Sequence, residues 1–112
     1  MAVLAKCLVE AKQVENVQTT QYTAANNITT IIDKFTMTNV TGGGVTVTVN
    51  IVRSGLVADT YNIIVSAKSI GAGETYIFPE IVGQILNPGD YISTIAGTAS
   101  ALNMRVSGRE IS

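Results

Sequence analysis

The sequence lacks histidine and tryptophan, and it contains only one cysteine and two prolines. Without histidine, the chain has neither the commonest general base nor the commonest metal ligand. Serine–histidine and cysteine–histidine catalytic pairs are therefore impossible within one chain. Cys7 has no second cysteine with which to form a disulfide or a thiolate metal site. We expect a protein without enzymatic activity and without a cofactor.

Charge is also scarce. Charged residues make up 13% of the chain and the net charge is −1, whereas a typical globular protein is about 25% charged. Such a balance provides no field that would attract nucleic acid. No apolar run approaches the roughly 20 residues that span a bilayer, and Lys6 interrupts the short apolar run at the start. We therefore expect no nucleic-acid partner, no membrane partner and synthesis in the cytoplasm without export.

What the sequence does contain is β-strand signals, separated by glycine, asparagine and proline turns. The turns recur every 8 to 12 residues, as in an antiparallel β-sandwich or jelly roll. We predict an all-β fold of about seven short strands. The predicted strands cover residues 17–22, 28–40, 45–53, 61–70, 75–78, 90–97 and 101–111.

Three stretches are less regular. Residues 1–16 are compatible with a short helical turn or with an extended arm, so we divide the chain into an arm or irregular segment (1–20) and one sandwich domain (21–112). In the strand 28–40, Asp33 interrupts an otherwise apolar face. Residues 79–86 read either as one helical turn or as an irregular crossing.

The strand 45–53 alternates between valine or isoleucine on one side and Thr46, Thr48 and Asn50 on the other. Threonine suits the pleat of a strand, but free monomers normally place Lys and Glu on outer faces. A hydroxyl that finds a hydrogen bond costs far less to bury than an unpaired charge. We therefore predict that other protein chains cover this face, and that the protein forms a stable homo-oligomer.

A second pair of candidate interface residues lies near the carboxyl end. Arg105 and Arg109 are two strand steps apart on one predicted face and could form salt bridges to a partner. The alternative is that they are exposed charges that deter the pairing of an edge strand.

Two longer runs carry a family resemblance: ANNITTIIDKFTMTNVTGGGVTVTVNIV (25–52) and GETYIFPEIVGQILNPGDYISTIAGTASALNMRVSGREI (73–111). Their strand and turn signatures, such as GETY, NPGD and SGRE, resemble small virion proteins of tailed bacteriophages, of the capsid decoration or cement type. The resemblance implies an all-β protein, without catalytic residues, that binds the outside of an icosahedral shell as dimers or trimers. The major capsid protein and a second copy of the chain are then the expected partners, and the virion surface the expected location.

Two other functions remain open at this point. A tail, neck or baseplate component, or a fibre attachment domain, would use the same fold and the same self-association. A carbohydrate-binding module would stack sugars on exposed aromatic rings, but the four tyrosines are scattered along the sequence and tryptophan is absent.

Overall fold

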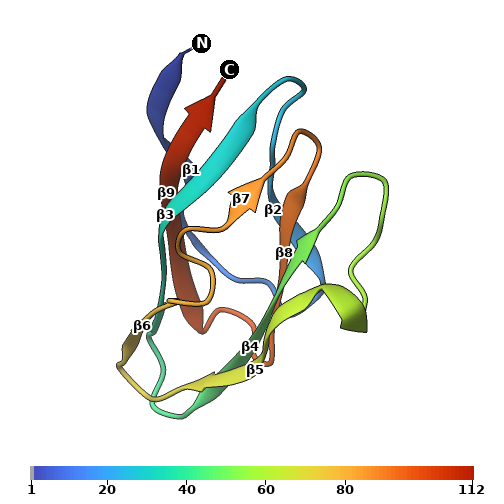
Figure 1. Cartoon of the computed structure of the whole chain (residues 1–112). Coiled ribbons are helices and arrows are strands. Elements are labelled where there is room, and N and C mark those ends of the chain that lie inside the picture. Colours follow the sequence, from blue (N-terminus) through green and yellow to red (C-terminus); the bar gives the residue numbers. More distant parts are fainter. Residues whose placement is uncertain (1) are drawn as a thin grey trace.

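The computed structural model describes residues 2–112, which fold into two antiparallel β-sheets packed face to face (Figure 1). The described residues form nine strands and one short 3-10 helix, η1. The elements are β1 (Val3–Gln13), β2 (Thr19–Thr23), β3 (Thr29–Asn39), β4 (Val45–Val52), η1 (Thr60–Asn62), β5 (Ile63–Ile70), β6 (Thr75–Ile77), β7 (Ile85–Leu86), β8 (Tyr91–Ala96) and β9 (Leu102–Ile111).

The first sheet has the order β1-β9-β3-β6, and β7 also pairs with β3. The second sheet has the order β2-β8-β4-β5. Neighbouring strands are antiparallel throughout both sheets. The predicted antiparallel β-sandwich is thus confirmed, with nine strands in place of about seven.

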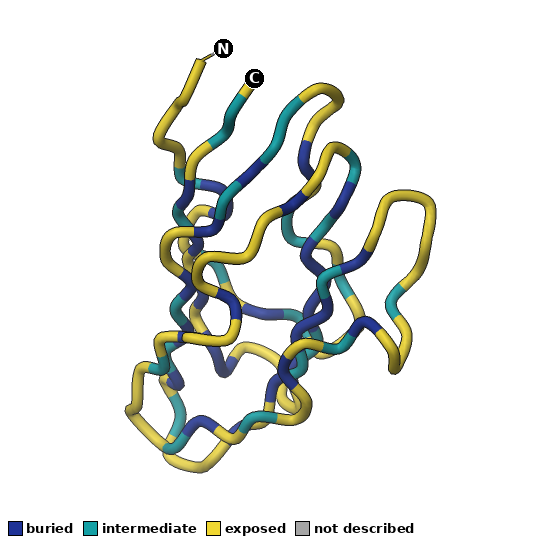
Figure 2. The backbone as a smooth tube through the Cα atoms, in the orientation of Figure 1, coloured by how far each residue is buried: buried dark blue, intermediate teal, exposed yellow. Residues whose placement is uncertain are grey.

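The core lies between the two sheets, and buried residues occur along the strands of both sheets (Figure 2). Because side chains alternate across a strand, every second residue is buried from Val45 to Val49 on β4 and from Leu102 to Gly108 on β9. The buried side chains are those of Val45, Val47 and Val49 on β4, and of Leu102, Met104 and Val106 on β9. The alternation read from both segments of the sequence is therefore confirmed at these positions.

The amino-terminal segment is part of the sandwich, which corrects the prediction of an arm or irregular segment over residues 1–20. β1 pairs with β9 from Val3 opposite Ile111 to Gln13 opposite Asn103. Leu8 and Val9 are buried in the core. Two register shifts within β1 hide the period-two pattern that would have indicated a strand. Met1 lies outside the described residues.

A β-bulge in β3 explains the charged residue on its apolar face. The pairing of β3 with β9 shifts between Ile32 and Lys34. The extra residue of a bulge changes which side chains face the core, so Ile32 is buried before the shift, and Phe35 and Met37 are buried after it. Asp33 occupies the bulge and is exposed.

Residues 79–86 form a crossing that contains one turn, in which the Phe78 carbonyl oxygen accepts from the Val82 backbone N–H at 3.0 Å, and that ends in β7. Phe78 closes β6 by donating its backbone N–H to the Phe35 carbonyl oxygen at 3.1 Å. The two phenylalanine rings meet edge to face, with centroids 4.9 Å apart. Ile81 of the crossing is fully buried. No helix within residues 2–112 has the length and apolarity to cross a bilayer.

Candidate protein interface

Two of the predicted interface residues lie on the outer face of the second sheet. The side chain of Thr46 is exposed and that of Thr48 is half-buried. The hydroxyl oxygen of Thr48 accepts a hydrogen bond of 3.0 Å from the backbone N–H of Ala67. That N–H belongs to a β5 bulge, where Ala67 has a φ of 45°. Thr48 therefore provides a hydrogen-bond partner for a backbone N–H that the bulge would leave unpaired. Of the two threonines, only Thr46 is exposed.

Asn50 is not an interface residue, which corrects its prediction as part of the outer face. Its side chain is 2% exposed because the loop after β4 folds over it. The Asn50 Nδ2 group donates to Asn62 Oδ1 at 2.6 Å and to the Asp59 carbonyl oxygen at 3.1 Å. The asparagine that alternation places toward solvent thus joins β4 to the loop that covers it.

The same loop is fixed from within. Asn62 Nδ2 donates to the Val57 carbonyl oxygen at 2.9 Å, and Asn62 Oδ1 accepts from the Asp59 backbone N–H at 2.9 Å. The Asp59 side chain accepts from the Thr60 backbone N–H at 2.7 Å and caps η1. Because Asn50 and Asn62 are both buried, these bonds form away from competing water, where hydrogen bonds are stronger.

Strand β8 and the turn before it anchor the other end of the loop. The Tyr91 hydroxyl donates to the Leu56 carbonyl oxygen at 2.6 Å. The Asp90 carboxylate accepts from the Ser54 backbone N–H at 3.1 Å and from the Asn87 backbone N–H at 3.0 Å. A stretch with little regular structure is therefore held in one conformation from both ends.

The anchored segment exposes three apolar side chains to solvent, those of Leu56, Val57 and Tyr61. We call these three residues the apolar loop. Val57 is 71% exposed and Tyr61 is 68% exposed. Single exposed apolar residues are ordinary, but these three lie within six residues on a segment whose backbone is fixed by hydrogen bonds. Strand periodicity does not indicate this loop. Its signal is the pair Leu56–Val57 inside a polar segment that begins with Ser54 and Gly55.

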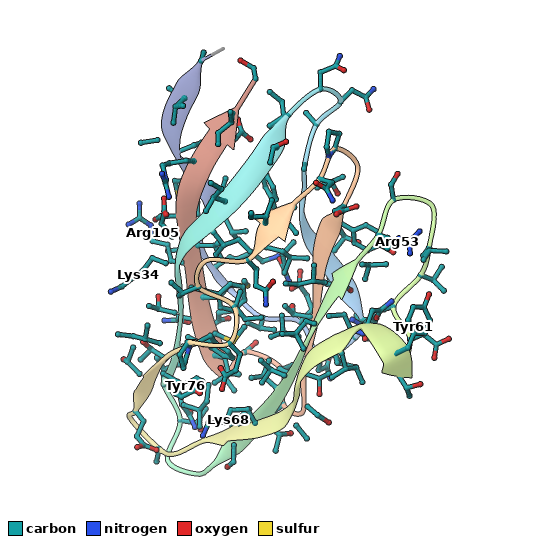
Figure 3. All side chains as sticks on the ribbon, viewed as in Figure 1. Lys34, Arg53, Tyr61, Lys68, Tyr76 and Arg105 are labelled. Atoms are coloured by element: carbon teal, nitrogen blue, oxygen red, sulfur yellow. The ribbon has the colours of Figure 1, made fainter. Side chains whose placement is uncertain are left out.

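Arg105 and Arg109 lie on the outer face of the first sheet, on the opposite side of the sandwich from Thr46. Arg109 pairs with Asp33, and its Nη2 lies 2.9 Å from Asp33 Oδ1. Hydrogen bonding to that carboxylate raises the pKa of Arg109. Figure 3 shows Arg105 beside Lys34 at one side of the molecule and Tyr61 at the other. The five predicted residues therefore do not form one site.

The most perturbed titratable groups link the two sheets. Tyr22 of β2 donates its hydroxyl to Glu110 Oε2 of β9 at 2.5 Å, and Lys6 Nζ lies 3.3 Å from Glu110 Oε1. Burial, followed by the bond to Glu110, raises the pKa of Tyr22 to about 12. The hydrogen bond from Tyr22, with a further one from Lys6, lowers the pKa of Glu110. We interpret this cluster as a polar bridge between the sheets.

One surface hollow lies beside β1 and β9. A cavity of about 240 Å³ is lined by Ala11, Lys12, Gln13 and Asn103. Small-molecule sites usually measure about 300 to 1,000 Å³ and converge several polar groups, so this hollow is below that range. Within the described part of the chain, no three His, Cys, Asp or Glu residues cluster to hold a metal ion.

Comparison with known proteins finds similarity of structure only. No family model matches the chain, and no curated protein matches its sequence. A protein of Bacillus endospore appendages, described as a family of disulfide-linked pili, shares 12% identity at a TM-score of 0.60. The match covers 98% of this chain and 88% of the appendage protein.

A chain of infectious bursal disease virus, Gx strain, shares 13% identity at a TM-score of 0.57. That match covers 97% of this chain but 32% of the viral chain, so the protein spans about a third of its length. At these identities, both matches show a common β-sandwich fold.

Proposed function

We propose that the chain is a structural virion protein without enzymatic activity, which binds the outside of a phage capsid and stabilises it. The apolar loop is the observation that carries this proposal. Its backbone is fixed by Asn50, Asn62 and Tyr91, while Val57 and Tyr61 project into solvent. Binding through a preorganised loop avoids the entropy cost of ordering it at the contact.

The chemistry of the loop fits a protein partner. Tyrosine is enriched among the residues that dominate binding energy, and such residues act from well-packed apolar pockets. We propose that Tyr61 and Val57 enter such a pocket on the major capsid protein. Each copy needs only a modest contact, because many copies act together on one shell.

Two further observations support a role in a large assembly. Thr46 leaves the outer face of the second sheet with an uncharged, hydroxyl-bearing surface, which costs little to desolvate. Two of the structural neighbours come from disulfide-linked pili and from a virus. The resemblance to phage decoration proteins adds the capsid surface as the location, after synthesis in the host cytoplasm.

Cosedimentation tests the proposal. Purified shells that lack the chain are mixed with the wild-type protein and with Val57→Asp, and binding is measured over a range of concentrations. We expect saturable binding of the wild type and at least tenfold weaker binding of Val57→Asp, because the loss of a dominant contact costs at least about 2 kcal/mol and about 1.4 kcal/mol is tenfold. Val17→Asp is the matched control, since Val17 is a similarly exposed valine outside the loop.

Wild-type binding that Val57→Asp and Val17→Asp weaken equally would show that the apolar loop is not the contact. No binding of the wild type to intact shells would reject the decoration role itself.

A second candidate function is a subunit of a filament, a tail or a neck. The length of the chain favours this function, because the alignment covers 88% of the appendage protein but only 32% of the viral chain. Copy number in purified particles separates the two. A decoration protein is present in hundreds of copies and a tail or neck protein in tens, which quantitative mass spectrometry distinguishes.

A further inference from the structure

The edge strands of the two sheets differ in how far they are protected from pairing with another chain. Natural edges are usually short, bulged or charged, because a long regular edge is a template for pairing. β6 and β7 are three and two residues long. β2 has five residues with a register shift, and β5 is interrupted by a shift near Ala67. β1 has eleven residues, and its first register shift comes only after Cys7.

One residue pair shows which backbone N–H and C=O groups of β1 point away from β9. Ala2 and Ser112 exchange two backbone hydrogen bonds, of 3.2 and 2.9 Å. In an antiparallel ladder, hydrogen-bonded and non-hydrogen-bonded pairs alternate. The backbone groups of Leu4 and Lys6 therefore point toward β9, and those at positions 3, 5 and 7 point outward from the sheet.

The side chains of the same segment are unusually open. Val3 is 58% exposed and Leu4 is 60% exposed, on opposite faces of the strand. Ala5 adds a small side chain on the Val3 face. Figure 1 shows β1 as the outermost strand of its layer, beside β9. Residues 3–7, four uncharged residues and Lys6, thus form a regular edge that pairs with no further strand within the described residues.

We propose that β1 is a self-association strand: two copies pair antiparallel about a two-fold axis at Ala5, which joins their first sheets into one. Val3 then lies opposite Cys7 of the partner subunit, and Ala5 opposite Ala5 of the partner subunit. Position 3 then pairs with position 7, 5 with 5, and 7 with 3 of the second copy. Each of these three pairs exchanges two backbone hydrogen bonds, so about six form.

The register is self-complementary, which favours a second copy over an unrelated peptide. Lys6 faces Leu4 of the partner subunit, so apolar surface covers the aliphatic part of the lysine. A register centred on Lys6 would place two like charges directly opposite, which is destabilising. The Lys6 ammonium group is already paired with Glu110 of its own chain, 3.3 Å away.

The strand lies on the side of the molecule away from the apolar loop (Figures 1 and 3), so pairing leaves Val57 and Tyr61 free for the shell. A five-residue ribbon buries less than the roughly 1,200 Å² of a stable interface. The isolated dimer is therefore weak and gains strength from multivalency on a particle. Self-association through β1 rests on the proposed function. Because it is tested on the isolated chain, a failure to dimerise can be distinguished from a failure to bind the shell.

Disulfide trapping tests the register. In Val3→Cys, the new thiol lies opposite Cys7 of the partner subunit, and paired strand positions are within the distance that a disulfide spans. With oxidised glutathione at about 100 μM protein, we expect a reducible dimer in which mass spectrometry finds the peptide joining positions 3 and 7. The matched controls are the wild type and Val3→Cys with Cys7→Ser.

In each control, equivalent thiols of two subunits are four residues apart along the ladder, about 13 Å, so cross-linking should fall at least tenfold. Equal cross-linking of variant and controls would mean random collision and would overturn the proposal. A folded Val3→Cys protein that stays monomeric would also overturn it.

Sedimentation velocity provides a test without thiols. Ala5→Pro removes a backbone N–H that points away from β9, so the chain should keep its own ladder and its melting temperature within a few degrees. We expect the wild type to show a concentration-dependent dimer up to about 1 mM, and Ala5→Pro to remain monomeric. Undiminished dimerisation of folded Ala5→Pro would contradict pairing through this edge.

Discussion

Asn50 and Asn62 are twelve residues apart in sequence, yet Asn50 Nδ2 donates to Asn62 Oδ1 at 2.6 Å and both side chains are buried. The bond joins the carboxyl-terminal part of β4 to the end of η1. Because it fixes the segment between them, it determines how Leu56, Val57 and Tyr61 are presented. The apolar loop therefore depends on a polar pair that does not itself touch a partner.

Replacing Asn50 by alanine should destabilise the fold and loosen the loop. The change removes the two hydrogen bonds that Asn50 donates to Asn62 Oδ1 and to the Asp59 carbonyl oxygen, each of which keeps one other donor. Two such bonds together contribute about 1 to 3 kcal/mol. Urea denaturation measures this loss. Thr46→Ala, on the exposed face of the same strand, is the control and should stay within about 0.5 kcal/mol of the wild type. Equal stability of Asn50→Ala and Thr46→Ala would contradict the anchoring role.

Gly108 is required where β9 lies against β3. A Cβ at this position would overlap the carbonyl oxygen of Ile31 and lie 2.8 Å from Leu8 Cδ1. Gly108→Ala should therefore destabilise the protein by about 1 to 3 kcal/mol, as overpacking does. Gly42→Ala is the matched control, because no atom lies within 4 Å of its added carbon. Thermal denaturation should lower the midpoint of the first variant and leave the second near the wild type.

The Glu110 carboxylate should contribute stability that is lost in acid. Its pKa is lowered in the folded chain below the usual 4.5 by the bonds from Tyr22 and Lys6. The contribution is therefore fully present above the unfolded pKa and disappears as the pH falls through the folded pKa. Glu110→Gln should be less stable than the wild type at pH 7, and the difference should shrink near pH 3.

Urea midpoints at the two pH values provide the measurement. Glu10→Gln is the control, since Glu10 is exposed on β1. A stability difference for Glu110→Gln that did not change between the two pH values would show that the Glu110 charge makes no contribution.

At the alkaline end, Tyr22 should ionise late. Burial and the bond to Glu110 raise its pKa from 10 to about 12. Because the folded pKa is the higher one, this stabilisation is complete below pH 10 and is lost between pH 10 and about 12. Absorbance near 295 nm follows the tyrosines, and Tyr22→Phe should remove a component that titrates near pH 12. In Glu110→Gln the Tyr22 pKa should fall only part of the way to 10, because burial is its larger cause.

The sequence predicted the layered fold because period-two alternation survives wherever a strand is regular. Val45, Val47 and Val49 alternate with polar residues, and all three are buried as expected. Bulges defeat the same reasoning. They shift the buried side of β3 at Asp33 and conceal the strand character of β1.

The interface residues were harder to predict, because alternation gives the face of a strand but not what covers it. Asn50 has the outward position that its spacing indicates, yet a loop from its own chain lies over it. Thr46 has no such cover. Sequence patterns do not reveal the apolar loop, because Val57 and Tyr61 lie in a segment without periodicity, where only long-range hydrogen bonds fix their exposure.

An electron-microscopy map of shells saturated with the protein tests the central claim most directly. The proposal predicts density for the sandwich on the outer surface of the shell, with Leu56, Val57 and Tyr61 in contact with the capsid protein. Density confined to the tail or neck, or a shell-bound sandwich whose apolar loop faces solvent, would contradict it.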